Sequence, residues 1–258
     1  MQNQLKDVLD RGQVALGAQL RFGSPGIAEL FGHAGFDWIV IDSEHAPQTP
    51  VGIQAQIQAI GNSSATPIVR LPKVDEEQIR LYLDMGAMGI MAAFVNTPDD
   101  AESGARACRY PPGGVRGWGP HRAAKYGLSA VEYTEQANDL VTFMGIIETA
   151  EAVENIDGIL AVDGFDSYVL GSVDLSISLG VPFDFECEIF QTAETKVLEA
   201  AKRAGKPPGI GVYRSPFEPG NMKQFADRGY QTLLVGGDEA FLSSGCQRMK
   251  QLRSDEGI

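Results

Sequence analysis

The chain has 258 residues, 43% of them hydrophobic and 21% charged, and its formal net charge at pH 7 is -13. This length and composition indicate a globular chain that folds as one barrel-sized domain over residues 1–258, because no spacer-like linker interrupts it. The acidic charge excludes nucleic acid as the main partner, since a phosphate backbone would be repelled by most of the surface.

Cysteine usage and the N-terminal segment indicate where the protein works. Cys108, Cys187 and Cys246 are far apart and form no CxxC or Cys/His cluster, which fits a reducing compartment and no structural zinc. The segment 1–13 is polar and lacks the apolar core of a signal peptide, and no apolar run approaches membrane-spanning length. We therefore expect a cytoplasmic protein with no membrane partner.

Short apolar runs alternate with amphipathic segments along the whole chain. After a first helix that ends near residue 12, strands are expected at 14–20, 38–41, 66–71, 89–94, 142–148, 167–171, 209–213 and 232–236. Helices are expected within 23–32 and at 51–61, 75–85, 98–109, 150–156, 189–204, 221–228 and 241–253. Most strand starts lie one βα unit apart, and insertions follow the fourth and sixth strands. Eight such units predict an α/β protein with a (β/α)8 TIM barrel rather than a doubly wound sheet.

Polar side chains gather at the predicted carboxyl ends of the strands, which share one face of a barrel and carry its chemistry. The stretch FDWIVIDSEHAP, residues 36–47, shows this most clearly, because a buried apolar run ends in acids and a histidine. The residues at these strand exits are Arg21, Asp42, Glu44, His45, Arg70, Glu148 and Asp174. We expect them to lie around one site.

Three types of chemistry are suggested by these residues. Glu148 and Asp174 offer hard oxygen ligands for Mg or Mn, with coordination positions left for water and substrate; the alternative is that each carboxylate only caps the helix that follows it. Arg70 lies in the apolar strand IVRLP and therefore needs an anion or a carboxylate as partner. His45 is the one histidine of three at a strand exit, where it is suited to proton transfer, or is a turn histidine at the surface.

Longer motifs give the chain a family resemblance. It resembles the class II pyruvate-dependent aldolases of the HpcH/HpaI type, which are metal-dependent (β/α)8 enzymes. The motifs run in order along nearly the whole chain: FDWIVIDSEHAP, VRLP at Arg70, LDMGAMGIMA, RYPPGGVRGWGPHRA, GIIETAEAVENIDGILAVDGFD and VLGSVDLSISLG. The resemblance also implies a homo-oligomer, a hexamer built as a trimer of dimers, in which the C-terminal helix is exchanged between subunits.

The resemblance assigns roles to individual residues. It implies that Glu148 and Asp174 bind a divalent metal (Mg, Mn or Co) and that His45 is the general base. Asp84, in LDMG, is implied to raise the basicity of that histidine, and Asp42 to hold the catalytic residues in place.

Substrate binding follows from the same resemblance. Arg70 is implied to stabilise the negative charge of an enolate, and the backbone at Ser172, Val173 and Asp174 to bind the pyruvate carboxylate. The chain also departs from the family pattern, with Ile146 in place of a usual glutamine and with Ser172 and Val173 in place of the more usual GPAD sequence. These departures leave a polar contact to the keto acid missing or supplied by another residue.

The insertion at residues 110–127 combines basic and aromatic side chains. We expect Trp118, His121 and Arg122 to line the aldehyde side of the site, where they would suit an acidic or polar, even aromatic, aldehyde. The alternative is a loop that makes contact between subunits.

The reaction that the resemblance implies is cleavage of a 4-hydroxy-2-oxo acid into pyruvate and an aldehyde through a metal-bound pyruvate enolate, or the reverse addition. Two alternatives stay open. One is a CoA-thioester lyase of the citrate lyase β type, which needs a basic surface that this acidic chain offers poorly. The other is a barrel that binds a small oxo acid without turning it over.

Overall fold

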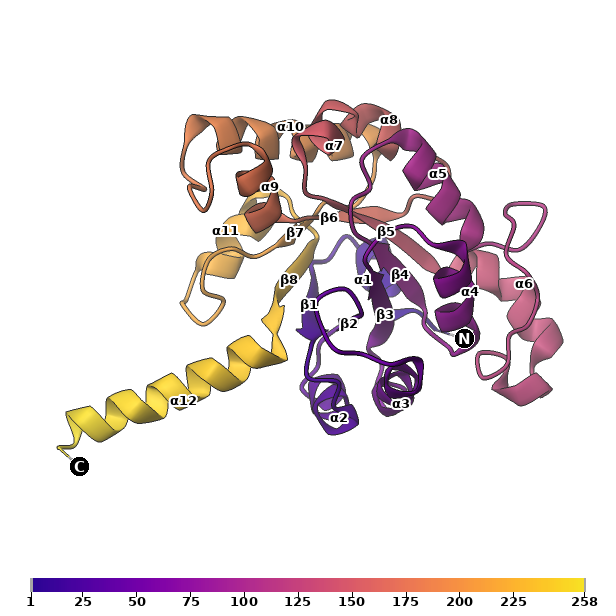
Figure 1. The fold of residues 1–258 in the computed structure, drawn as a ribbon, viewed down its shortest axis with the longest axis horizontal. Helices are drawn as coiled ribbons and strands as arrows, with labels where there is room; N and C mark the ends of the chain where they lie inside the picture. The colour runs from indigo at the N-terminus through magenta and orange to yellow at the C-terminus, as the bar shows by residue number, and fades with distance from the viewer. Residues whose placement is uncertain (1, 258) are drawn as a thin grey trace.

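In a computed structural model, which describes residues 2–257, parallel strands form a closed barrel in which each strand pairs with the next and β8 pairs with β1 (Figure 1). The strands are β1 (Ala15–Leu20), β2 (Trp38–Asp42), β3 (Thr66–Leu71), β4 (Gly89–Ala92), β5 (Thr142–Ile147), β6 (Ser167–Leu170), β7 (Gly209–Gly211) and β8 (Thr232–Gly237). The predicted (β/α)8 barrel is therefore confirmed.

Helices follow the strands and cover the outside of the barrel (Figure 1). They are α1 (Gln4–Asp10), α2 (Pro25–His33), α3 (Pro50–Ile60), α4 (Glu76–Asp84), α5 (Pro98–Ala107), α6 (Ala130–Leu140), α7 (Ala150–Glu154), α8 (Ile156–Leu160), α9 (Ser172–Ser178), α10 (Glu188–Ala204), α11 (Asn221–Arg228) and α12 (Asp238–Asp255). A short 3-10 helix, η1, spans Lys125–Gly127. Most of the predicted helices are present with bounds shifted by one or two residues.

Several helices begin at a polar residue that the sequence places directly after a strand exit. Ser24, Thr49, Asp75, Thr97 and Thr149 each accept a backbone N–H of the first helical turn. Such caps satisfy donors that have no partner inside a helix. They fix where each helix starts and therefore where each strand-to-helix loop opens.

Apolar side chains fill the inside of the barrel toward the amino-terminal ends of the strands. The Trp38 ring lies over Gly17 of the neighbouring strand, where any side chain at position 17 would overlap it. Below it, Leu5 and Val8 of α1 pack into the same cluster, and the Asn3 amide donates hydrogen bonds to backbone and side-chain oxygens at the base of β5. The lower end of the barrel is thus closed, which leaves the carboxyl ends of the strands as the open end.

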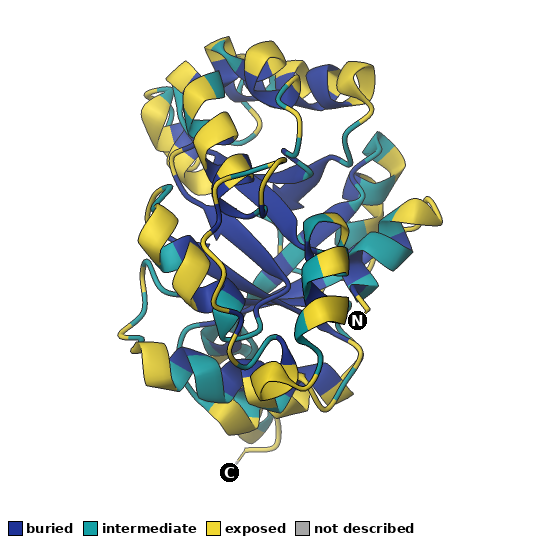
Figure 2. Ribbon diagram, turned by 90° about the vertical axis from the view of Figure 1, so that its right-hand side faces the viewer, coloured by how far each residue is buried: buried dark blue, intermediate teal, exposed yellow. Residues whose placement is uncertain are grey.

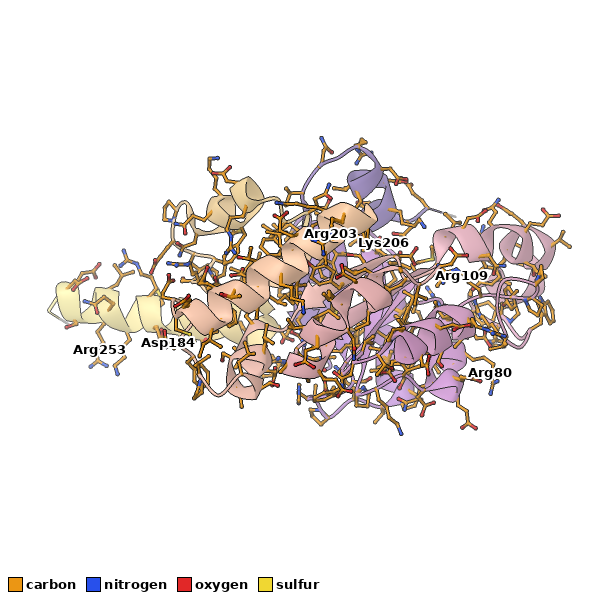
Figure 3. The ribbon with its side chains drawn as sticks, turned by 90° about the horizontal axis from the view of Figure 1, so that it is seen from above. Arg80, Arg109, Asp184, Arg203, Lys206 and Arg253 are labelled. Atoms are coloured by element: carbon orange, nitrogen blue, oxygen red, sulfur yellow. The ribbon has the colours of Figure 1, made fainter. Side chains whose placement is uncertain are left out.

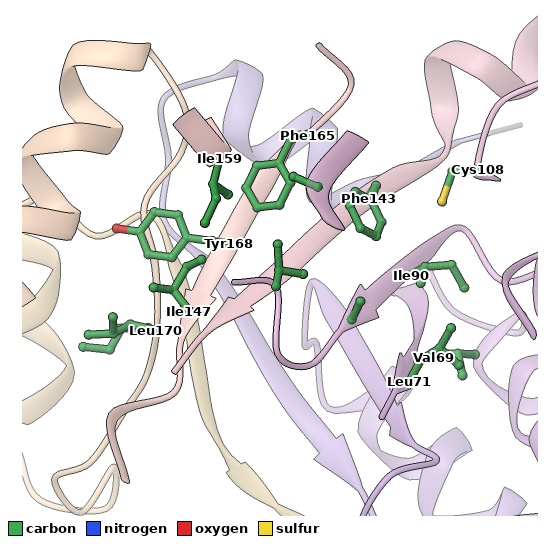
Figure 4. Close-up of a cluster of buried hydrophobic side chains, with 14 of the residues drawn as sticks. Val69, Leu71, Ile90, Cys108, Phe143, Ile147, Ile159, Phe165, Tyr168 and Leu170 are labelled. Carbon is green, nitrogen blue, oxygen red and sulfur yellow. The ribbon is translucent and has the colours of Figure 1, made fainter. Parts of the chain in front are cut away.

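The main core lies between the barrel and the helices. Figure 2 shows the strands as buried and the outer sides of the helices as exposed. Figure 4 shows part of this layer, where Phe143, Ile147 and Tyr168 point outward from β5 and β6 toward Ile159 and Phe165. Strands covered on both sides read as continuous apolar runs, which is why they were visible in the sequence.

The structure differs from the prediction in several places. The insertion after β4 contains helix α6, which was not predicted, and the helix expected at 150–156 is two short helices, α7 and α8, that meet at Asn155. The fourth strand ends at Ala92 instead of residue 94. Phe94 has a left-handed backbone, with φ of 53°, so the chain turns away from the strand direction at this point.

The last helix, α12, extends away from the barrel (Figure 1), and among its described side chains only Asp238 is buried. Seen from above in Figure 3, α12 carries Arg253 out into solvent, and Arg80 and Arg203 lie on the outer surface of the barrel helices. That this helix is exchanged between subunits stays a prediction. No helix among residues 2–257 is long and apolar enough to cross a membrane.

Candidate active site

A cavity of about 540 Å³ opens at the carboxyl ends of the strands. Gln19, Arg21, His45, Arg70, Glu148 and Asp174 are among the residues that line it. The barrel therefore brings the predicted strand-exit residues together, with Asp42 directly beneath them. In a (β/α)8 barrel this is the end at which active sites are found.

Asp42, at the end of β2, lies at the centre of the polar side chains of the cavity and is fully buried. Its Oδ1 accepts the backbone N–H groups of Glu44 (2.9 Å) and His45 (3.1 Å). Its Oδ2 accepts the Gln19 amide (2.6 Å) and the Arg21 guanidinium (3.1 Å). Burial alone would raise the pKa of Asp42, but the Arg70 guanidinium and the two N–H donors lower it below 3.8. Asp42 thus stays ionised at neutral pH, and its carboxylate holds together β1, the loop after β2 and β3.

Arg70, the predicted arginine of β3, projects into the cavity with a nearly buried side chain. Its Nη1 lies 3.8 Å from Asp42 Oδ2, and its Nη2 forms an ion pair with Glu44 Oε2. His45 Nε2 lies 3.5 Å from that same Glu44 oxygen, and its ring is 55% exposed toward the cavity. Glu44 therefore joins a guanidinium and an imidazole, a role that the sequence did not assign to it.

Glu148 follows β5 and is 2% exposed. Its Oε1 accepts the N–H of Phe94 at 2.8 Å, which is the contact that the left-handed turn after β4 makes available. Burial raises the pKa of Glu148 to about 7, and the nearby Asp174 and Glu44 act in the same direction, while Arg70 lowers it. The surrounding protein therefore stabilises the charged form of Glu148 poorly.

Asp174 lies in the first turn of α9, beside Glu148, and Ser172 and Val173 precede it in the same turn. The Ser172 hydroxyl donates to the backbone carbonyl of Gly211, which ties α9 to β7. At Gly171, a Cβ would lie 2.8 Å from the Cβ of Glu148. Only a glycine fits at position 171, because a larger side chain there would collide with Glu148.

Asp84 is not brought to His45 within one chain. It ends α4, which runs antiparallel to its neighbouring strands, so it lies toward the opposite end of the barrel from the cavity. Its Oδ1 pairs with Arg116 Nη2 at 2.6 Å, and that guanidinium is fully buried against the ring of Tyr110. Among residues 2–257, the carboxylate beside His45 is that of Glu44.

The three insertion residues also lie away from the cavity. The exposed Trp118 donates its indole N–H to Thr134 at 3.0 Å, and His121 packs edge-on against Tyr126. Arg122 donates to the carbonyl of Met85 at 3.1 Å. Within one chain none of the three lines the cavity, because the loop is anchored at the end of α4 by Arg122 and by the Ala123 N–H, which donates to the carbonyl of Asp84.

Gln19 is one of the lining residues that the sequence analysis did not select. It lies two residues before Arg21 on β1, and Gly17, Gln19 and Arg21 share the inward face of that strand because side chains alternate. That alternation was the available signal, since an amide on the inward face of a buried strand requires a polar partner. Its partner is Asp42.

The fold and the site define a (β/α)8 enzyme whose cavity combines an imidazole, a guanidinium and two adjacent carboxylates. Residues 20–242 match the model of the HpcH/HpaI aldolase/citrate lyase family, and the chain belongs to this family. The predicted enzyme class, a carbon–carbon lyase of the aldolase type, is confirmed by this match and by the names of relatives.

Two relatives and one solved structure illustrate the similarity. A 4-hydroxy-2-oxovalerate aldolase of Rhodococcus jostii is 40% identical over 209 residues, which is 81% of each chain. A 4-hydroxy-2-oxo-heptane-1,7-dioate aldolase of Salmonella paratyphi C is 35% identical over 96% of this chain and 94% of its own. The crystal structure of an HpcH/HpaI aldolase/citrate lyase family protein from Burkholderia cenocepacia has a TM-score of 0.90 at 33% identity, covering 98% of this chain and 100% of its own.

Proposed function

We propose that the chain is a class II aldolase that cleaves 4-hydroxy-2-oxo acids to pyruvate and an aldehyde and catalyses the reverse addition. The observation that carries this proposal is the Arg70 guanidinium fixed by Asp42 and Glu44 in the same cavity as Glu148 and Asp174. The names of the relatives support the reaction type.

A divalent cation fits the carboxylate pair. Among residues 2–257 no group of three or more His, Cys, Asp or Glu residues forms a ready metal site, so any ion here would be held by Glu148 and Asp174 and completed by water and substrate oxygens. Burial and the neighbouring carboxylates raise the pKa of Glu148 to about 7, and a cation would offset the cost of its charge. Two hard oxygen ligands suit Mg or Mn, as well as Co. When bound, the ion would supply Lewis-acid polarisation of the 2-oxo group.

Arg70 stabilises the charge that develops during cleavage. When the C3–C4 bond breaks, its electron pair moves toward the 2-oxo group, and negative charge grows on that oxygen. A guanidinium already held in place by two carboxylates needs no reorganisation to meet this charge. The backbone at Val173 and Asp174 lines the cavity beside it and offers N–H donors to the substrate carboxylate.

His45 moves the proton. In the cleavage direction its imidazole accepts the proton of the 4-hydroxyl group, directly or through water, and the aldehyde carbonyl forms as the C3–C4 bond breaks. Glu44, 3.5 Å from Nε2, stabilises the imidazolium that results. In the addition direction the same proton returns to the new hydroxyl group.

Asp84 can act on His45 only if another copy of the chain supplies it. Asp84 stays partly exposed beside the buried Arg116, and the exposed Trp118 is two residues further along the same loop, as expected if this loop meets the open cavity of a second subunit. The predicted homo-oligomer would then complete the site with Asp84 and with Arg122. Solution scattering or analytical ultracentrifugation of the purified chain tests the assembly itself.

Pyruvate release from a panel of 4-hydroxy-2-oxo acids, with and without Mg, Mn and Co, tests the function. We expect metal-dependent release that His45→Asn reduces strongly, while His33→Asn, at the exposed end of α2, keeps the wild-type rate as a matched control. Full activity of the His45 variant contradicts its role as base. Absence of pyruvate release from every substrate rejects the aldolase proposal and leaves a barrel that only binds an oxo acid.

A further inference from the structure

The wall of the cavity divides into two arcs of different chemistry. Arg70, Glu148 and Asp174, which serve the keto acid half of the substrate under the proposed function, come from β3, β5 and the helix after β6. The opposite arc is formed by β8 and β1, which are neighbours in the closed barrel. Because the carboxylate and the 2-oxo group are held on the first arc, the aldehyde half faces the second.

Gln19 is the neutral amide on this second arc. The lower cavity wall near it is otherwise apolar, with Met91, Ile146, Val169 and Leu234. Gln19 is buried, with only 6% of the residue exposed. A polar side chain kept in apolar surroundings needs partners for all its polar atoms.

The bond to Asp42 fixes how the amide is turned. A carboxylate only accepts hydrogen bonds, so the atom 2.6 Å from Asp42 Oδ2 must be the nitrogen Nε2. The second N–H and the carbonyl Oε1 then point away from Asp42, and among residues 2–257 Oε1 has no hydrogen-bond partner. The amide therefore presents one donor and one acceptor to the cavity.

The neighbouring strand leaves space beside this amide. The register between β1 and β8 shifts so that Gly17 pairs with Leu234 but Gln19 pairs with Gly237. The extra residue on β8 is accommodated at Gly236, whose φ is 132°, a conformation that favours glycine. Gln19 thus has a glycine opposite it, and the side chain that lies over this glycine is the carboxylate of Glu239 at the start of α12.

The charges around Gln19 restrict what can bind there. Arg21, the cation of this arc, is already shared between Asp42 (3.1 Å) and Glu239 (2.7 Å). An anionic group on the aldehyde would approach two carboxylates with no uncommitted cation between them among residues 2–257. A hydroxyl group carries one donor and one acceptor and no charge, which matches the free atoms of the amide.

We propose that Gln19 is a specificity-determining residue that contacts the aldehyde half of the substrate and favours a hydroxyaldehyde over an apolar aldehyde of the same size. This inference rests on the proposed aldolase function. Sites built to bond a hydroxyl group discriminate against analogues that lack it, because their own polar groups are then left unpaired.

The test compares two aldehydes of equal size, glycolaldehyde and propanal, in metal-dependent addition to pyruvate by the full chain. The measured quantity is the ratio of kcat/KM for glycolaldehyde to that for propanal, so differences in intrinsic reactivity cancel between variants. We expect Gln19→Leu to lower this ratio roughly three- to tenfold, the worth of one neutral hydrogen bond. Gln19→Met repeats the test with an unbranched side chain, and Met91→Leu, on the other arc, should leave the ratio unchanged.

The outcomes separate the proposal from its alternatives. An unchanged ratio in both Gln19 variants overturns the proposal and leaves the aldolase function intact. An equal loss with both aldehydes also overturns it, because Gln19 would then act only by supporting Asp42. Failure of the wild-type chain to consume pyruvate with any aldehyde overturns the aldolase function and this inference together.

Discussion

Replacing Glu148 with glutamine is expected to stabilise the metal-free protein at alkaline pH. Burial raises the pKa of Glu148 to about 7 in the folded chain, whereas the ordinary pKa of a glutamate, which applies in the unfolded chain, is 4.5. Between these values the unfolded state binds fewer protons than the folded state, so stability falls as the pH rises through this window. The difference corresponds to about 3 kcal/mol in the free energy of unfolding at pH 8.

Urea unfolding in the presence of excess EDTA measures this effect. At pH 8 we expect Glu148→Gln to be more stable than wild type by up to about 3 kcal/mol, and at about pH 4 the two should be nearly equal, because Glu148 is then mostly protonated in both the folded and the unfolded state. The glutamine oxygen can still accept the Phe94 N–H. Glu194→Gln is the matched control, since Glu194 is also buried but pairs with Arg228 at 2.9 Å, and its loss should be destabilising.

Addition of Mn to the same samples should reverse the order. A ligand that binds only the folded state stabilises it by mass action, and the wild type keeps both carboxylates while the variant has one. If Glu148→Gln is less stable than wild type at pH 8 in EDTA, the carboxylate is not strained by its surroundings and the electrostatic case for a cation here fails.

Further variants test other parts of the structure. Arg70→Lys should lower kcat for pyruvate release by roughly 10²- to 10³-fold, because an ammonium cannot hold both Asp42 and Glu44 and meet the substrate; a loss below about threefold contradicts this role. The lowered pKa of Asp42 stabilises the folded chain above pH 3.8, and this stability is lost as the pH falls through the folded-state pKa. Asp42→Asn should therefore remove the loss of stability that occurs below pH 3.8, which urea titrations at about pH 2.5 and about pH 6 measure. Gly17→Ala should cost about 1–3 kcal/mol by overlap with the Trp38 ring, and a thermal midpoint equal to that of wild type would show that the ring can move aside.

The barrel could be predicted because its strands are covered on both sides. β3, at Thr66–Leu71, has the bounds that the sequence indicated, since a polar turn at residues 62–64 comes just before the apolar run and Pro72 ends it. Asp75 marked the start of α4 for an equally local reason, because its carboxylate accepts two backbone N–H groups of the first turn. Helix α6 was missed because it belongs to an insertion that packs as a small separate cluster of its own, outside the repeat of βα units from which the other helices were predicted.

The positions of the site residues were predictable from strand ends, but their partners were not. Strand order places Asp42, Arg70 and Glu148 on one rim, and no local pattern states which carboxylate meets which cation. Asp84 illustrates this. It lies at the end of α4, in the LDMG motif, and its partner Arg116 comes from a loop about 30 residues later. Pairings of this kind depend on the loop conformation and not on the period of the sequence.

The arrangement of charge in the cavity explains why one acid is stable and its neighbour is strained. Asp42 is surrounded by donors from three elements, and these hold its pKa below 3.8 despite its burial. Glu148, equally buried, receives a single backbone N–H and faces another carboxylate. The first acid therefore organises the cationic side chains without further help, whereas the second retains unsatisfied negative charge directed into the cavity. Such a difference between two buried acids is expected where one supports the site and the other binds a cation.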